Sequence, residues 1–201
     1  KISEILIRLN FKIQENKITA VCTTSKQVAT DEVVLASGAW SESLVKQLGI
    51  QLSVQAGKGY RINIHQPTGI RLPAILLEAK VAVTPMQGFT RFGGTMELSG
   101  INHLINTKRV AAIARAASAF YPNVVPNQTD IDEVKCGLRP LSPDGLPYIG
   151  RHSKCANLVL ATGHSMMGWS LGPATGKLVA ELISDQPTTL SLLPFSAERK
   201  Y

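Results

Sequence analysis

Apolar and polar residues alternate through much of the first third of the chain, which predicts β-strands. Residues 33–36 are apolar on both parities, so the segment 31–36 is predicted to be a buried strand. Ser41 is predicted to cap a helix over 42–48, and Gly49 to end it. The strands expected here cover residues 5–7, 11–13, 18–23 and 31–36, with a turn at 15–17.

The middle third predicts antiparallel hairpins followed by a helix. The helix is expected over 108–120, with Thr107 as its cap and Pro122 beyond its end. Its apolar residues fall on one face at helical spacing: Val110, Ile113, Ala114, Ala117 and Phe120. The expected strands cover residues 52–54, 60–64, 74–77, 81–84, 90–92 and 95–98.

The last third changes character. Residues 137–151 hold three prolines and three glycines, which predicts an ordered loop, because each of these residues fixes a particular backbone state. A short buried strand is expected over 158–161, followed by a glycine-rich turn over 163–172. Pro173 suits the first turn of a helix that continues to about residue 184.

Composition narrows the class of protein. The 201 residues, 44% of them apolar, suit one large domain or two small ones. The formal net charge is +7, but adjacent basic residues occur only at 108–109 and 199–200, so nucleic-acid binding is not expected. No apolar run approaches the about 20 residues of a membrane-spanning helix. The first residue is Lys rather than Met, so we expect a piece of a longer protein.

Cysteine and histidine spacing argues against a metal site. The three cysteines are widely spaced without a CxxC pair, which excludes a zinc motif or disulfide framework and favours a reducing compartment. His65, His103 and His152 have no partner at ligand spacing. Ser165 does not lie in a GxSxG motif, so no hydrolase triad is expected.

Residues 33–40 form the first candidate motif, a buried strand that runs into a corner of small residues. Ser37 and Gly38 at this corner would allow a ligand to approach the backbone closely. An ordinary strand-to-helix turn uses glycine in the same way, and taken alone the segment favours that interpretation.

Residues 163–176 form the second candidate, a glycine-rich turn that opens a helix. The free N–H groups at a helix start attract negative charge. No GKS or GKT sequence follows, and GxGxxG occurs nowhere in the chain, so this is not a phosphate-binding P-loop. Alternatively, the glycines only pack the helix closely against the strand.

Arg139 is the third candidate. Pro140 and Pro143 stiffen the segment that carries it, and a rigidly held guanidinium suits bidentate capture of a carboxylate. The alternative is a structural ion pair, for instance with Asp144, and spacing alone favours that alternative.

Taken in order, the motifs resemble the family of FAD-dependent amino-acid oxidoreductases that includes D-amino-acid dehydrogenases and oxidases, glycine oxidase and sarcosine oxidase. The resemblance covers nearly the whole chain and is most specific over 137–176. The Lys-Gly-Tyr and Gly-His-x-x-x-Gly-Trp forms are most similar to bacterial D-amino-acid dehydrogenases. The matching motifs are DEVVLASGAWS, KGY, GGTME, GLRPLSPDGLPYIGR and GHSMMGW.

The resemblance implies an α+β fold. Residues 1–40 would end an FAD-binding α/β domain, 41–135 would form a substrate domain with an antiparallel sheet and flanking helices, and 136–201 would return to the FAD domain. The N-terminal Rossmann unit of the family, with its GxGxxG motif, is missing here. The chain would therefore be a C-terminal fragment that binds FAD weakly or not at all by itself and is inactive alone.

The resemblance also implies roles for individual residues. Arg139 would bind the substrate carboxylate, Tyr60 would line the substrate pocket, and Ser37 and Gly38 would lie near the ADP half of FAD. Met166 stands where the glycine-oxidase branch has an arginine, which argues against that substrate preference. The residues expected to face the flavin ring are Gly163, His164, Ser165, Met166, Met167, Gly168 and Trp169.

The function implied is oxidation of an amino acid by hydride transfer from Cα to flavin N5. The same fold could act on another carboxylate substrate, such as an N-methyl amine, a proline-like imino acid or a 2-hydroxy acid, or the chain could be a binding module without catalysis. The expected partners are an amino-acid substrate and the missing N-terminal half of the enzyme. A cytoplasmic location is expected, with a peripheral contact to the inner membrane left open.

Overall fold

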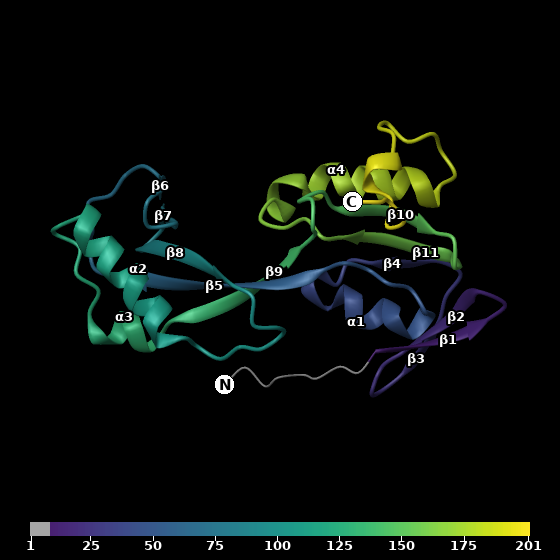
Figure 1. The fold of residues 1–201 in the computed structure, drawn as a ribbon, viewed down its shortest axis with the longest axis horizontal. Coiled ribbons are helices and arrows are strands. Elements are labelled where there is room, and N and C mark those ends of the chain that lie inside the picture. The colour runs from purple at the N-terminus through teal and green to yellow at the C-terminus, as the bar shows by residue number, and fades with distance from the viewer. Residues whose placement is uncertain (1–8) are drawn as a thin grey trace. The chain divides into compact units, whose positions relative to one another are not determined.

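The computed structural model describes residues 9–201, which form two units (Figure 1). Unit 1 combines the segment up to Gln55 with Arg139–Tyr201, and unit 2 comprises Ala56–Leu138. The divisions at 55/56 and 138/139 fall later than the 40/41 and 135/136 of the sequence-based domains. Helix α1 (Ser41–Val45) belongs to unit 1 because Val45 lies in the core of that unit. The strand expected at 5–7 lies outside the described residues.

Unit 1 contains two three-stranded sheets. Strands β1 (Asn10–Gln14), β2 (Lys17–Cys22) and β3 (Gln27–Ala29) form an antiparallel meander. In the other sheet the strand order is β10-β11-β4, with β4 parallel and β10 antiparallel to β11. Its strands are β4 (Val33–Leu35), β10 (Tyr148–His152) and β11 (Cys155–Thr162).

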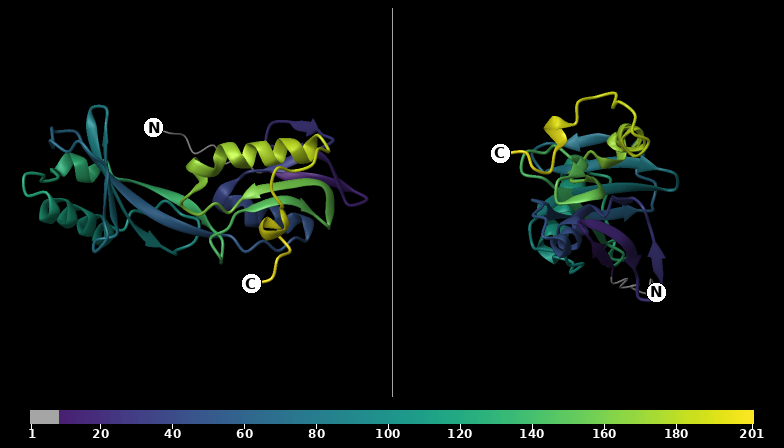
Figure 2. Two further views of the ribbon diagram at one scale, coloured as in Figure 1. Left: turned by 90° about the horizontal axis from the view of Figure 1, so that it is seen from above. Right: turned by 90° about the vertical axis from the view of Figure 1, so that its right-hand side faces the viewer.

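Helices cover both faces of the β10-β11-β4 sheet: α4 (Gly168–Ile183) lies on one face and α1 on the other (Figures 1 and 2). Buried Asn157 on β11 joins this sheet to the meander, because its side chain bonds both the N–H and the carbonyl of Ile18 at 2.9 and 2.8 Å. The buried apolar core of unit 1 consists of Ile18, Val33, Leu35, Val45, Ile50, Leu52, Val54, Tyr148, Cys155, Leu158 and Leu160.

Unit 2 is built around a five-stranded sheet with the order β6-β7-β8-β5-β9. Helix α2 (Thr107–Phe120) packs closely on it at Gly94, where a Cβ would lie only 3.0 Å from the Ile113 side chain. A short helix α3 (Gln128–Asp132) follows. The strands are β5 (Gln55–Ile64), β6 (Ala74–Leu76), β7 (Val81–Met86), β8 (Phe89–Glu97) and β9 (Lys135–Leu141).

The structure corrects two sequence-based elements. Residues 137–151 are not a loop, because β9 and β10 occupy most of them and only 142–147 form a turn. Pro140 is tolerated in β9 because β9 is the edge strand of its sheet, where a missing N–H costs little. Residues 52–54 belong to no strand, since the N–H of Val54 donates to the carbonyl oxygen of Leu52 at 2.9 Å, and β5 begins only at Gln55.

Helix boundaries differ as well. Helix α4 begins at Gly168, so Pro173 lies inside it rather than in its first turn. Asn106, not Thr107, caps α2, since its side chain accepts from the N–H groups of Lys108 and Arg109. Ser41 is the first residue of α1 instead of its cap. Gly49 ends this helical segment at φ 65°, as the sequence predicts.

Candidate functional site

Arg139 lies near the end of β9, half-buried. Within residues 9–201, no carboxylate pairs with its guanidinium and no oxygen accepts from it. The proposed ion pair with Asp144 is absent, because Asp144 instead pairs with Arg199 at 2.8 Å. Burial lowers the pKa of Arg139, since its charge has lost water without gaining a partner. The site therefore holds an uncompensated cation that an incoming anion would satisfy.

The glycine-rich turn lies directly beside the Arg139 strand. The N–H of Ser165 donates to the carbonyl oxygen of Pro140 at 2.8 Å. Leu141 and His164 form an antiparallel bridge next to it. Arg139 and the turn that opens α4 are thus held together by backbone contacts, although they are far apart in the sequence.

The conformation of this turn depends on glycine. Gly163 has φ 78°, and a Cβ there would lie 2.8 Å from the ring of Tyr148. At Gly168, a Cβ would lie 3.3 Å from the Cβ of His164. The turn can therefore approach its neighbours more closely than side chains would permit.

Apolar side chains surround the start of α4. Met166, Met167 and Trp169 are exposed, Trp169 at 96%. Met167 is the N-cap residue, and no side chain caps the helix, so its first N–H groups are left without a side-chain acceptor. The arrangement combines an apolar surface with the positive end of a 16-residue helix.

The first candidate motif, residues 33–40, contacts the end of β11 near the glycine turn through Thr162. Its hydroxyl donates to the carbonyl oxygen of Gly38 at 3.2 Å and pairs with the hydroxyl of Ser41 at 2.8 Å. Gly38 has φ 55°, and Ser37 precedes it at the corner after β4. Because β4 and β11 are parallel, their carboxyl ends bring this corner and the glycine turn to one edge of the sheet.

A groove of about 360 Å³ runs beside this edge. One wall is the glycine face of α4, and His164 contributes another side. The Nε2 of His164 bonds the hydroxyl of Thr175 at 2.8 Å, and burial lowers the pKa of the imidazole. The lining residues are Val34, Ala36, Ala161, His164, Gly168, Gly172, Thr175, Gly176 and Val179.

Tyr60 belongs to unit 2, where it is 1% exposed. Its hydroxyl donates to Oε2 of Glu97 at 2.8 Å. Lys58, also 1% exposed, pairs with Oε1 of the same carboxylate at 3.1 Å, and Arg109 pairs with Oε2 at 3.0 Å. The structure places Tyr60 in this charged cluster of unit 2, and its role in lining the substrate pocket stays a prediction.

Sequence reasoning missed the burial of Lys58. The available signal was parity, because Lys58 shares the inward face of β5 with Tyr60 and Ile62. A lysine on a buried face requires a counter-charge, which is Glu97.

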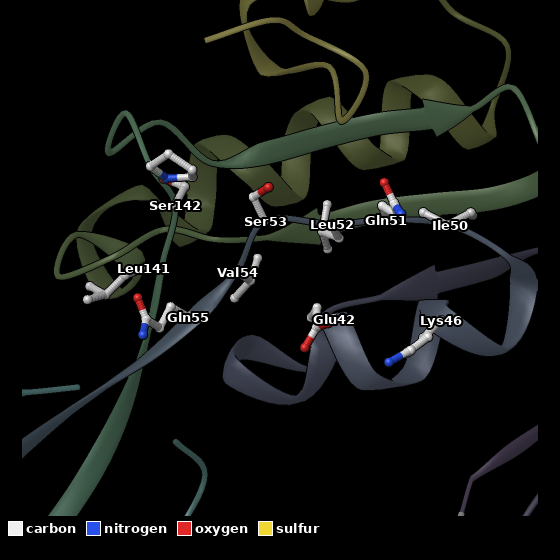
Figure 3. A pocket seen from close by; sticks show the side chains of 11 residues that line it. Glu42, Lys46, Ile50, Gln51, Leu52, Ser53, Val54, Gln55, Leu141 and Ser142 are labelled. Atoms are coloured by element: carbon white, nitrogen blue, oxygen red, sulfur yellow. The ribbon is translucent and has the colours of Figure 1, made fainter. Parts of the chain in front are cut away.

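A separate hollow of about 730 Å³ in unit 1 was also missed (Figure 3). Glu42 lines it from α1 and Lys46 from directly after that helix, whereas Leu141 and Ser142 line it from the end of β9 and the turn beyond. Leu141, Ser142 and Pro143 lie in the 137–151 motif, but the other lining residues belong to no motif, so the sequence did not indicate a hollow here.

Two classes of site are absent from the described part of the chain. Among residues 9–201, no three His, Cys, Asp or Glu side chains gather as metal ligands would. Nor does any helix within that range have the length and apolarity needed to cross a membrane.

Comparison with known proteins defines the class. The model of the family described as DAO, FAD dependent oxidoreductase, matches residues 7–182. The chain belongs to this family of FAD-dependent flavoproteins, which confirms the resemblance and the expected cofactor.

Curated relatives narrow the comparison. A D-amino-acid oxidase of Bradyrhizobium diazoefficiens is 34% identical over 191 residues, covering 94% of this chain and 45% of the relative. A D-amino acid dehydrogenase of Vibrio atlanticus is 32% identical, with 92% and 45% covered. The chain thus spans about 45% of the length of each of these two curated relatives.

Solved structures agree on the fold. Glycine oxidase from Geobacillus kaustophilus matches with a TM-score of 0.77 at 29% identity, over 97% of this chain and 52% of that one. L-proline dehydrogenase from P. horikoshii matches with a TM-score of 0.82 at 22% identity, over 96% and 53%, and this similarity concerns the fold alone. The mixed sheet-and-helix fold expected from the sequence is confirmed at this level.

The residues present fit FAD. The start of α4 has no side-chain cap, and exposed apolar side chains surround it. A flavin ring has apolar faces and gains negative charge when it is reduced, so apolar contact and positive potential both suit it.

Proposed function

We propose that this chain forms the carboxylate-binding and flavin-facing part of an FAD-dependent enzyme that oxidises an amino acid at its Cα–N bond. The observation that carries the proposal is the half-buried, unpaired guanidinium of Arg139, on a strand whose next two residues bond the turn that opens α4. The curated relatives with D-amino-acid oxidase and dehydrogenase names support the substrate class.

Each part of the site has a role in this proposal. Arg139 binds the substrate carboxylate through two parallel N–H donors and fixes the orientation of Cα. The turn from Gly163 to Trp169 faces the flavin ring, and the start of α4 stabilises negative charge beside it. Ser37 and Gly38 lie near the ADP half. When bound, FAD supplies the acceptor for the hydride that leaves Cα.

No side-chain acid or base is required by this scheme. His164 is engaged with Thr175, and burial lowers its pKa, so it is neutral near pH 7. Positioning and electrostatics are therefore the contributions of this chain. We also propose that a complementary dinucleotide-binding part completes the FAD site, so that residues 1–201 alone bind FAD weakly and are inactive.

Replacing Arg139 tests the proposal. In the FAD-loaded protein at full length, Arg139→Leu should raise the KM for a D-amino acid roughly 10- to 100-fold, the loss of a charge-assisted bidentate contact. Arg139→Lys should have a smaller effect because the charge remains. Steady-state kinetics with a dye acceptor measures both.

Lys135 provides the matched control, since it is an exposed cation on the same strand. Lys135→Leu should leave the KM within about twofold of the original value, as for other exposed substitutions. An unchanged KM in Arg139→Leu would remove the carboxylate role.

A second candidate keeps the site and changes the substrate. Arg139 requires only a carboxylate, and the matched folds include enzymes named for glycine and L-proline. N-methyl amines, proline-like imino acids and 2-hydroxy acids therefore belong in the same substrate screen, and the highest kcat/KM identifies the class.

A further inference from the structure

Arg199, far from Arg139 in the sequence, is the most completely bonded arginine near this site. Its side chain is 9% exposed. Its guanidinium donates two parallel hydrogen bonds to the Asp144 carboxylate, from Nε to Oδ2 at 2.8 Å and from Nη2 to Oδ1 at 2.9 Å. The remaining donors reach the carbonyl oxygens of Leu146 at 2.8 Å, Pro147 at 3.2 Å and Ser196 at 3.0 Å. All five guanidinium donors are therefore used.

These bonds fix the turn that follows the Arg139 strand. Asp144, Leu146 and Pro147 lie in residues 142–147, between the end of β9 and the start of β10. Asp144 also accepts from the N–H of Leu146 at 3.1 Å, so its carboxylate stabilises the turn from within. The hydrogen bonds from Arg199 stabilise the same turn from outside it.

The same guanidinium packs on a second element of the site. Its carbon Cζ lies 4.2 Å from the centroid of the Tyr148 ring. Tyr148 is 1% exposed, and its hydroxyl donates to the carbonyl oxygen of Ser53 at 3.0 Å. Its ring occupies the space where Gly163 would carry a Cβ. Arg199 thus supports, through one ring, the first residue of the glycine turn.

We propose that Arg199 is a positioning residue for both halves of the site: through Asp144 it holds the end of the Arg139 strand, and through Tyr148 it holds the turn at Gly163. This inference rests on the proposed function for its kinetic readout only. A site that depends on a guanidinium and a glycine turn at fixed separation requires a rigid support for both.

The experiment uses the FAD-loaded protein at full length with Arg199→Gln and Arg199→Lys. For Arg199→Gln, we expect roughly tenfold increases in the KM for the amino-acid substrate and in the Kd for FAD, since small displacements of positioning groups have effects of this order. Arg199→Lys keeps the positive charge but loses the bidentate guanidinium. Its KM and its Kd for FAD should therefore lie between those of the unaltered protein and those of Arg199→Gln. Hydrogen exchange at the amides of 163–168 should accelerate in the same order.

Lys200 provides the matched control, because it is the next residue, carries the same charge and is exposed. Lys200→Gln should change each quantity less than twofold. A lower Tm in Arg199→Gln with KM, Kd for FAD and amide exchange unchanged would show a merely structural residue and overturn the proposal.

A double-mutant cycle tests the route through Asp144. If Arg199 acts through that carboxylate, combining Asp144→Asn with Arg199→Lys should raise the KM little beyond either single variant. Multiplying effects would contradict this route. If Arg199→Gln does not fold, Asp144→Asn and Arg199→Lys provide the same test with milder substitutions.

The two proposals fail separately. If the unaltered protein oxidises no amino acid, the proposed function is wrong. The Kd for FAD and the amide exchange rates still test the positioning role of Arg199 in that case. If oxidation is intact and neither of those quantities responds to Arg199, only the positioning role is wrong.

Discussion

Two arginines of unit 1 show how partners decide the role of a side chain. Arg199 uses every donor within the protein, whereas Arg139, half-buried, has none of its donors satisfied within residues 9–201. A buried cation without a partner is unfavourable for folding, and this cost is consistent with a binding role that supplies the partner later. Asp144 binds Arg199 through both of its oxygens and forms no ion pair with Arg139.

At the residue scale, Gly163 is predicted to be irreplaceable for packing. Gly163→Ala forces a Cβ to 2.8 Å from the Tyr148 ring and requires φ 78° of an L-residue. Overpacking costs about 1–3 kcal/mol and the left-handed conformation about 1–2 kcal/mol, so the unfolding free energy should fall by about 2–5 kcal/mol. Urea unfolding measures the difference.

Gly145 separates the two costs, since it has the same φ of 78° and open space around its Cβ position. Gly145→Ala should lose only about 1–2 kcal/mol, the conformational part. Equal losses in the two variants would show that the contact with Tyr148 does not matter.

At the element scale, the edge position of β9 and the early start of α4 determine the site. Proline and glycine in 137–151 correctly indicated fixed backbone, but they could not reveal that β5 provides a neighbour on one side of β9. Likewise, α4 begins as early as Gly168, because a turn directly before it is stabilised by the hydrogen bond from the Met167 N–H to the His164 carbonyl oxygen at 2.9 Å. Both features depend on neighbours that local propensity does not contain.

Strands β5 and β8 carry the charged cluster of unit 2, and its pH dependence is predictable. Hydrogen bonds from Ser99 and Tyr60, with a further contribution from Lys58, lower the pKa of Glu97 to about 2. Because the folded pKa is below the ordinary value of 4.5, this stabilisation is complete above about pH 4.5 and is lost as the pH falls towards 2.

Glu97→Gln should therefore lower the urea midpoint near neutral pH and flatten its decline between pH 4.5 and 2. Urea titrations at several pH values, followed by circular dichroism, provide the measurement. Glu133→Gln, which alters an exposed carboxylate of the same unit, should leave the profile unchanged. A profile for Glu97→Gln that parallels the unaltered protein would rule out the linkage.

At the scale of the whole molecule, the chain forms unit 2 as an insertion between the two segments of unit 1. Each unit has its own buried apolar cluster, one around Leu158 and the other around Ile113. Separate cores allow separate unfolding transitions.

The two tryptophans, Trp40 and Trp169, both belong to unit 1, so their fluorescence reports that unit. Ile113→Ala should destabilise unit 2 by about 2–5 kcal/mol and shift the circular dichroism transition, with the fluorescence midpoint unchanged. Leu158→Ala should shift the fluorescence midpoint by a comparable free energy. Coincident fluorescence and circular dichroism midpoints in both variants would indicate a single cooperative unit instead.

The sequence by itself determined the positions of most strands and of α2, the motif residues and the family. These follow from local periodicity and from short runs whose glycines and prolines have few permitted conformations. The tertiary structure alone decided that Asp144 pairs with Arg199, 55 positions away, which leaves Arg139 unpaired, and that the glycine turn meets Pro140. The physical reason is that partner choice depends on distances created by folding, and one sequence contains no signal for which of several opposite charges will be nearest.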